Sequence, residues 1–476
     1  MLARPRPTWL VAVFVLLSSI FLRWPAANYD ELLYTNAALG SVDDSFVSAR
    51  LLGKPVLLLP YIGALKAWIF RPIYAVFGFS IELTRLVTIG MAALAIWLIV
   101  RAVSARHNVA GWCVAGLLVT SPSLMELTRV DVGPNVIEFL LLALLLALLL
   151  RSEQRFGGRD CALVSLVFVV GTFNKLNFLW WVVTFVVIVA IARRLPAVRS
   201  RGMALLVLSF AACVGYVRFI SQHFHLGEGF GPKTLFRNHA VLSLVHSVAD
   251  GSWFRWLAYR NGRPPTSVML AILWAATLVV CVGTVIARKQ KNAFALVAGI
   301  AAAFAMISSV LEAQRGWHVL MLLPLCAVLV ATVVMGESDG FSMTRILCGA
   351  VIAAQLLTSL WVVHARTDSG TVAYTHAIYQ LADVTKPALG LVYLTDWGMK
   401  SYLQSADHTR AKYVETFWSG VASLQCSSLV VVRNDGEVMA NAHAGAVTLV
   451  RDLPKIASVT DPDGAAIFLV YSTPTC

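Results

Sequence analysis

The stretch KPVLLLPYIGALKAWIFRPIYAVFGF, Lys54–Phe79, decides how the chain is threaded through a membrane. It is hydrophobic, but Pro60, Lys66, Arg71 and Pro72 interrupt it. Proline and charged side chains are each costly in a helix that faces lipid. We therefore predict one or two amphipathic helices on the membrane surface here, not a crossing.

The composition places the rest of the chain in a membrane. Of 476 residues, 58% are hydrophobic and only 13% are charged, and many apolar runs approach the roughly 20 residues that span a bilayer. The formal net charge is +13, but Arg and Lys lie singly or in short groups between apolar runs. We expect them to anchor the chain by the positive-inside rule and expect no nucleic-acid partner.

Eleven apolar runs are predicted to cross the membrane, which gives an all-α polytopic bundle. The run after Arg4 and Arg6 has no small-residue cleavage site behind it, so it is interpreted as the first helix and not as a signal peptide. The runs are Leu10–Leu22, Leu86–Val103, Val109–Leu124, Val136–Leu150, Cys161–Phe173, Phe178–Ala192, Met203–Ile220, Val268–Ile286, Ala293–Val310, Val319–Met335 and Ile346–Val363.

The loop charges predict the orientation. If Lys54–Phe79 does not cross and the N-terminus is inside, the loops rich in Arg and Lys all face the cytoplasm. The C-terminus is then extracytoplasmic, and a bacterial inner membrane is the expected location. The outer loops include a large first loop, 24–84, and a second, 222–265.

The C-terminal segment, 366–476, is more polar than the membrane domain, 1–365. Short apolar runs such as LGLVYLT and AAIFLVY alternate there with the helix-like WGMKSYLQSA, which predicts a small extracytoplasmic α/β domain. Cys426 and Cys476 lie in this segment and could form a disulfide. The other six cysteines lie in or beside apolar runs, where a thiol acts as a small hydrophobe.

Ionisable residues collect on the predicted outer face, where they could line one cavity. A carboxylate there can accept the proton of an attacking hydroxyl, and cations can hold a lipid-linked phosphate. The candidate base is Asp30 or Glu31. The candidate phosphate contacts are Lys54, Lys175 and Arg315.

The same residues also have structural interpretations. Asp30 and Glu31 suit the first turn of a surface helix, and Asp131 suits the cap of a helix that begins near Pro134. Lys175, like other basic residues at membrane helix ends, could simply snorkel to the interface. These alternatives remain open at the level of sequence.

Two segments carry a family resemblance. YDELLYTNAALG and LLGKPVLLLPYIGALKAWIFRPIYAVFGFSIELTRLV resemble the start of the GT-C superfamily of membrane glycosyltransferases. The likeness is to the branch with protein O-mannosyltransferases and the bacterial aminoarabinose and galacturonic acid transferases of lipid A. The matching positions are Asp30-Glu31, Lys54-Pro55, Phe77-Gly78 and Arg85.

Weaker matches follow in the same order along the chain. Asp131 before Gly133-Pro134 resembles the family's second loop aspartate. Asn174-Lys175 stands where the family has Thr-Lys, and Arg315 stands in a basic turn where relatives can have lysine. The resemblance implies catalytic roles for Asp30, Glu31 and Asp131, and donor-phosphate contacts from Lys54, Arg85, Lys175, Arg315 and His318.

The resemblance also implies an activity. A hexosyl or pentosyl unit would pass, with inversion, from a polyprenyl-phosphate donor to a hydroxyl of lipid A, another glycolipid, a polysaccharide or a protein at the outer face. No cofactor is required; a divalent metal is possible but not indicated. His223 and His225 form a His-x-His pair without a nearby Cys or acidic partner, which we interpret as surface histidines and not a metal site.

The main alternative is a transporter or flippase for a lipid-linked or polar substrate. Such proteins usually carry ionisable groups near the bilayer midplane and internally repeated halves. Here the apolar runs are nearly free of charge and no repeat is apparent. A non-catalytic scaffold would leave the outer-face charges unexplained.

Overall fold

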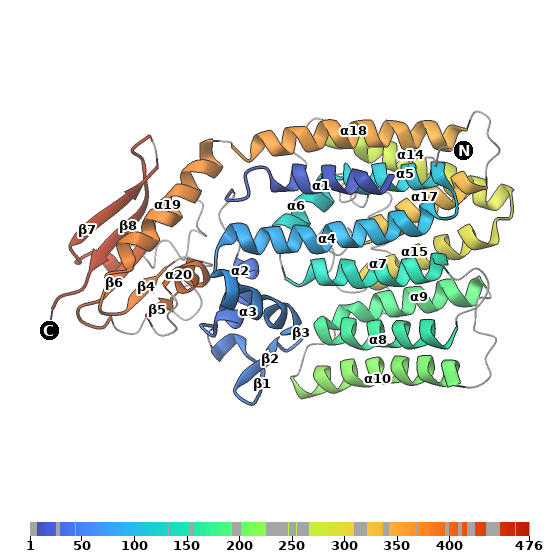
Figure 1. Cartoon of the computed structure of the whole chain (residues 1–476). Coiled ribbons are helices and arrows are strands. Elements are labelled where there is room, and N and C mark those ends of the chain that lie inside the picture. Colours follow the sequence, from blue (N-terminus) through green and yellow to red (C-terminus); the bar gives the residue numbers. More distant parts are fainter. Residues whose placement is uncertain are drawn as a thin grey trace. The chain divides into compact units, whose positions relative to one another are not determined.

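The computed structural model describes residues 7–475 apart from several gaps, and the chain folds as two compact units (Figure 1). The first unit comprises Met1–Ile20, Pro60–Gly63 and Leu86–Val362. The second comprises Phe21–Leu59, Ala64–Arg85 and Val363–Cys476. The residues outside the description are 1–6, 25–28, 43, 132, 152–156, 193–200, 225–245, 247–253, 255–265, 309–320, 337–341, 368, 396–398, 408–411, 417–423, 435–447, 462 and 476.

Each of the eleven predicted apolar runs overlaps at least one helix. The helices are α1 (Leu10–Ser19), α4 (Ile81–Ser104), α5 (Asn108–Val119), α6 (Pro122–Arg129), α7 (Asn135–Arg151), α8 (Gly158–Asn174), α9 (Leu179–Ile191), α10 (Arg201–His223), α14 (Thr266–Ala287), α15 (Lys291–Ser308), α17 (Leu323–Met335) and α18 (Met343–Ala365).

The helices make this a multi-pass membrane protein. Among the described residues, α4, α10, α14 and α18 are long and apolar enough to cross a bilayer, and the pair α5 and α6, bent by 56°, would add a fifth. The outward sides of several helices are apolar: Leu166, Leu208 and Val279 expose 58%, 66% and 68% of their surface. Such surfaces suit lipid, not water. The full count of eleven crossings stays a prediction.

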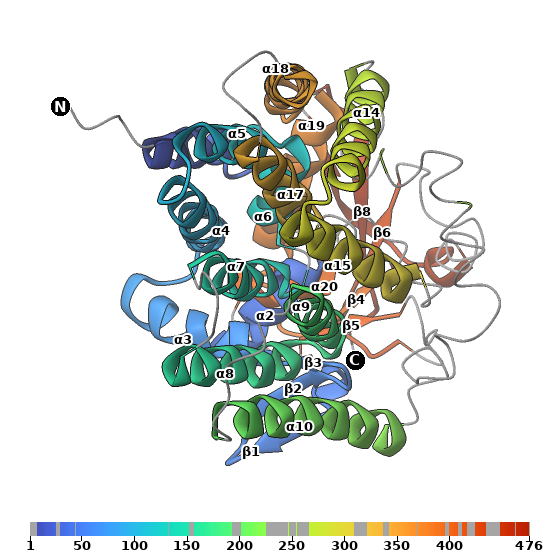
Figure 2. The same ribbon diagram turned by 90° about the vertical axis from the view of Figure 1, so that its right-hand side faces the viewer.

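Small residues bring the helices of the first unit close together. Within it α8 lies beside α10, α9 beside α15, and α5 beside α17 (Figure 2). A Cβ at Gly299 of α15 would lie 2.4 Å from Ile188 of α9, and one at Gly116 of α5 would lie 2.4 Å from Ile352 of α18. Glycine therefore allows these backbones to approach, as in other membrane bundles.

The second unit contains a five-stranded sheet with the order β5-β4-β6-β8-β7. β4 pairs in parallel with β5 and β6, and β8 pairs antiparallel with β6 and β7. Helices α19 and α20 accompany the sheet. The elements are α19 (Ser369–Thr385), β4 (Val392–Leu394), α20 (Met399–Asp407), β5 (Tyr413–Glu415), β6 (Leu429–Arg433), β7 (Lys455–Thr460) and β8 (Ala466–Ser472).

The first loop packs with this C-terminal segment. Leu32 of α2 (Tyr29–Leu39) belongs to the same buried apolar core as Leu381 of α19, Leu403 of α20 and Phe468 of β8. The predicted boundary at 366 lies close to where the C-terminal part of this unit begins, but loop 24–84, which the prediction assigns to the membrane domain, lies mostly in the second unit.

The prediction of helices for Lys54–Phe79 was wrong for its first part. Lys54–Leu59 is strand β2, which pairs antiparallel with β1 (Ala49–Leu51), and Ile62–Gly63 is the short strand β3. Leu52 and Gly53, with φ of 50° and 73°, close the β1–β2 turn. Pro55 and Pro60, which suit extended backbone, explain why a helix does not start here. The remainder is helix α3 (Leu65–Phe77).

The described cysteines fall into two groups, one disulfide-bonded residue in the C-terminal segment and six free thiols in the membrane domain. Cys426 is disulfide-bonded, whereas Cys113, Cys161, Cys213, Cys281, Cys326 and Cys348 are free. Cys476 lies outside the described residues, so its pairing with Cys426 stays a prediction.

Candidate active site

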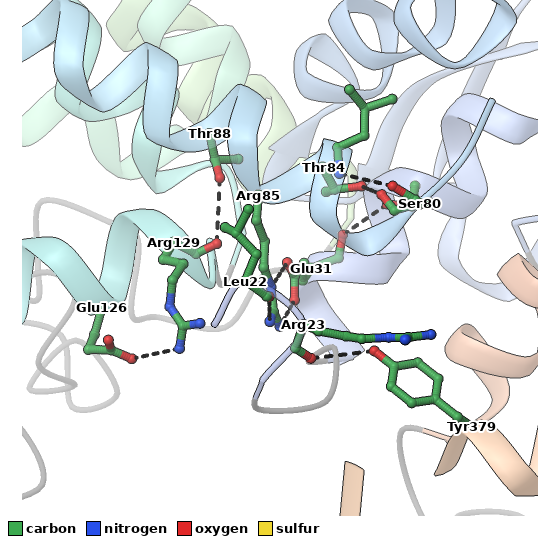
Figure 3. Close-up of polar contacts among 12 residues, drawn as sticks. Leu22, Arg23, Glu31, Ser80, Thr84, Arg85, Thr88, Glu126, Arg129 and Tyr379 are labelled. Carbon is green, nitrogen blue, oxygen red and sulfur yellow. Dashed lines mark hydrogen bonds and ion pairs between the residues drawn. The ribbon is translucent and has the colours of Figure 1, made fainter. Parts of the chain in front are cut away.

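An ion pair fixes the helix that carries the two adjacent carboxylates. Arg85 donates from Nε to Glu31 Oε1 at 2.9 Å and from Nη2 to Oε2 at 3.0 Å (Figure 3). Its Nη1 also donates to the Leu22 carbonyl at 2.6 Å. The side chains of Arg85 and Glu31 are 0% and 2% exposed. The guanidinium of Arg85 and the carboxylate of Glu31 thus form a bidentate ion pair.

Asp30 is the residue before Glu31 in α2. Its side chain lies outside the description, so its catalytic role stays a prediction.

Further polar contacts hold α2 in the second unit. Asn36 donates to Gln404 of α20 at 3.5 Å, and Tyr74 of α3 shares hydrogen bonds with Thr35 at 3.3 Å and Thr84 at 2.7 Å. Burial raises the pKa of Tyr74 to about 12, so its hydroxyl keeps its proton throughout the physiological range. The position of α2 is therefore set from two sides.

The two lysines of this part of the chain have opposite surroundings. Lys54 is exposed on β2. Lys66 of α3 is only 1% exposed, and its ammonium lies 4.9 Å from the ring centre of Tyr34 in α2. In the sequence Lys66 is recognisable only as a charge that interrupts an apolar run. A buried lysine against an aromatic face is a cation–π contact.

A second group of polar residues lies within the first unit, at the start of α7 and the end of α8. We call it the polar cluster. It comprises Asp131, Asn135, Glu138, Asn174 and Lys175.

Asp131 joins this cluster as a cap. It is fully buried, and its Oδ1 accepts from the backbone N–H of Val136 at 3.1 Å. This hydrogen bond supports the interpretation of Asp131 as the cap of α7.

Lys175 and Glu138 supply the opposite charges of the cluster. Lys175 Nζ donates to Asn135 Oδ1 at 3.1 Å. Glu138 is 1% exposed; the ammonium of Lys175 attracts its charge, and the carboxylate of Asp131 repels it. Glu138 was not among the predicted site residues, although a lone carboxylate inside the apolar run VIEFLLLALLLALLL is a signal of function.

Residues Pro60–Gly63 of the first loop belong to the first unit, and their backbone pairs with the backbone beside the polar cluster. Ile62 of β3 pairs with Lys175 in an antiparallel bridge, and Leu176 N–H donates to the Tyr61 carbonyl at 3.1 Å. These contacts fix the backbone of the turn at Lys175 and Leu176, which we call the lysine turn. The turn's geometry therefore depends on how closely β3 approaches it.

We expect Gly63→Ala to disturb this turn. A Cβ at Gly63 would lie 2.3 Å from the backbone oxygen of Phe173, and backbone cannot rotate away as a side chain can. The expected loss is about 1–3 kcal/mol of unfolding free energy, measured by thermal denaturation in detergent. Gly90→Ala is the matched control, because nothing lies within 4 Å of its Cβ. Equal stability of the two variants would contradict the close approach.

Another buried pair lies in the first unit, and some predicted residues lie outside the description. Arg129 is buried and pairs with Glu126 at 3.3 Å, and its carbonyl accepts from Thr88 at 3.5 Å (Figure 3). Arg315, His318, His225 and most of loop 222–265 lie outside the described residues. Within the described part of the chain, no group of three or more His, Cys, Asp or Glu could hold a metal ion.

Comparison with solved structures identifies the fold. The crystal structure of ArnT from Cupriavidus metallidurans in the apo state matches with a TM-score of 0.56 at 14% identity, over 97% of this chain and 96% of that one. The archaeal oligosaccharyltransferase AglB from Archaeoglobus fulgidus, in complex with an inhibitory peptide and a dolichol-phosphate, matches with a TM-score of 0.43 at 11% identity, over 84% and 64%. No protein-family model and no curated protein matches the chain.

The chain therefore shares the fold of the ArnT structure. This likeness covers nearly the whole length of both chains, and it agrees with the fold that the first-loop resemblance predicts.

Proposed function

We propose that the protein is a GT-C glycosyltransferase. It transfers a hexosyl or pentosyl unit from a polyprenyl-phosphate donor to a hydroxyl acceptor at the outer face of a bacterial inner membrane. The GT-C fold over nearly the whole chain supports the reaction class. The acceptor is a glycolipid such as lipid A, a polysaccharide or a protein.

The polar cluster is the observation that carries this proposal. Buried carboxylates and a buried lysine at one end of a membrane helix bundle are costly and are retained for function. A lysine held there can neutralise the phosphate that accumulates charge as it leaves the sugar. In the predicted orientation, this end of the bundle is the outer face.

The reaction divides among the residues as follows. Asp30 accepts the proton of the acceptor hydroxyl, whose oxygen attacks the anomeric carbon as the bond from that carbon to the phosphate oxygen breaks. The polyprenyl phosphate leaves with the bonding electrons, and attack from the opposite face inverts the configuration. Lys175 stabilises the leaving phosphate, with Lys54 and Arg315 as further contacts.

Glu31 and Arg85 take a different part from the one first predicted for them. Because each already satisfies the other, we assign them to holding α2, and thus Asp30, in position. Asp131 supports the cluster by capping α7. No cofactor is needed for this chemistry, so a chelator should leave the rate unchanged.

The test supplies the purified protein in nanodiscs with three labelled donors: a polyprenyl-phosphate sugar mixture, the matching polyprenyl-diphosphate sugars and nucleotide sugars. Membrane lipids and envelope extracts serve as acceptors, with and without a chelator. We expect transfer from the polyprenyl-phosphate donors alone. Transfer from nucleotide sugars would contradict the donor class. Uptake of donor into sealed vesicles without transfer would favour the transporter alternative.

Lys175→Met is expected to lower transfer by about 10²- to 10³-fold, because one electrostatic contact to the developing charge is lost. The change also leaves Glu138 without its cation, so stability must be measured in parallel. Lys175→Met with Glu138→Gln removes that stability penalty and should still lack activity. Recovery of transfer in the double variant would assign Lys175 to stability only.

A further inference from the structure

The first unit contains a cavity of about 390 Å³ at the end of the bundle opposite to the polar cluster. Helix α7 connects the two: Asn135 belongs to the cluster, and Leu149 and Leu150 line the cavity. At 1.5 Å per residue they are about 20 Å apart along the helix. The cavity is therefore separate from the proposed active site.

Most of the cavity wall is apolar. Leu149 of α7, Ile188 of α9 and Leu296 of α15 are buried side chains in this wall, and the half-buried Met335 of α17 also lines it. Four different helices thus contribute apolar side chains to the wall of this cavity. An alkyl chain suits such a surface, whereas a water-soluble metabolite with several polar groups does not.

The polar part of the lining is positive. Arg106 and Lys291 both line the cavity, and the described residues that line it include no carboxylate. Helix α15 begins at Lys291, so the positive end of an 18-residue helix also faces this region. The charge is complementary to an anion.

Gln290 adds a specific acceptor. Its side-chain oxygen is buried and has no hydrogen-bond donor among the described residues, and Gln290 lines the cavity. A buried acceptor without a donor favours a ligand that brings a hydroxyl.

We propose that this cavity binds an anionic phospholipid with a hydroxylated headgroup, of which phosphatidylglycerol is the simplest. Its phosphate contacts Arg106, Lys291 and the start of α15, its glycerol hydroxyl donates to Gln290, and one acyl chain lies along the apolar wall. The positive-inside rule predicts that this end of the bundle meets the cytoplasmic leaflet. The proposal does not depend on the transferase activity at the other end.

The test measures phosphatidylglycerol binding to the delipidated full chain by native mass spectrometry. Each removed charge should weaken binding about fivefold, from about 1 kcal/mol per basic residue, so Arg106→Gln with Lys291→Gln should weaken it about 25-fold. Lys289→Gln is the matched control, because Lys289 is exposed in the same turn but does not line the cavity. Ala192→Trp, which fills the cavity without changing charge, should also weaken binding.

The outcomes separate the possible sources of the anion. Wild-type binding by the Arg106/Lys291 double variant would overturn the proposal. Displacement of phosphatidylglycerol by inorganic phosphate at equal concentration, together with unchanged binding by Ala192→Trp, would mean that the site holds a free anion and not a lipid. Equal binding of phosphatidylcholine would remove the role of the negative charge.

Discussion

Replacing Arg85 by Met is expected to lower the unfolding free energy by about 3–5 kcal/mol. The change removes the bidentate partner of Glu31 in a site with almost no solvent, and breaking one side of a buried ion pair has this cost. The pair is bidentate, with contacts of 2.9 and 3.0 Å, and both side chains are buried. The measurement is thermal or denaturant unfolding of the purified protein in detergent.

Two further variants show whether the loss comes from the unpaired charge. Arg85→Met with Glu31→Leu removes both charges, and such apolar replacements are often neutral or stabilising, so most of the stability should return. Arg23→Gln breaks the Arg23–Glu82 pair at 3.5 Å, whose side chains are 62% and 41% exposed, and should cost less than about 1 kcal/mol. A double variant as unstable as Arg85→Met alone would contradict this account.

The helices could be predicted from sequence because lipid imposes a strong and local rule. An apolar run without charge satisfies its own backbone hydrogen bonds only as a helix, so each predicted run overlaps one. The strand Lys54–Leu59 could not be predicted in this way, since its partner Ala49–Leu51 lies beyond a turn with two residues at positive φ. Apolar character alone does not separate a short strand from a helix.

The packing of the first loop with the C-terminal sheet depends on contacts between residues more than 300 positions apart. Asn36 and Gln404, or Leu32 and Phe468, carry no local pattern that pairs them. The sequence likewise pointed to Asp131 and Lys175 as neighbours on one face, and both lie in the polar cluster, but their catalytic role stays a prediction. Glu138 was not predicted because it is a single charged residue in the run Val136–Leu150, which was interpreted only as an apolar membrane helix.

Replacing Asp30 by Asn is expected to lower sugar transfer by about 10²- to 10⁴-fold, the usual contribution of a general base. Asn keeps the size of the side chain, but it cannot accept the hydroxyl proton. Glu31 cannot substitute for it, because its carboxylate is engaged by Arg85. The measurement is the initial rate from a polyprenyl-phosphate sugar at matched protein amounts.

The comparison with Glu31→Gln distinguishes catalysis from folding. Asp30→Asn should lose transfer with its unfolding temperature unchanged, whereas Glu31→Gln should lose stability, because Arg85 is left buried without its counter-charge. Asp44→Asn is the surface control: Asp44 lies in the same loop and pairs with the exposed Arg50, so neither readout should change much. Full transfer by a stable Asp30→Asn protein would remove Asp30 from catalysis. The base would then have to come from another carboxylate of the chain, for which Asp131 and Glu138 of the polar cluster are the next candidates.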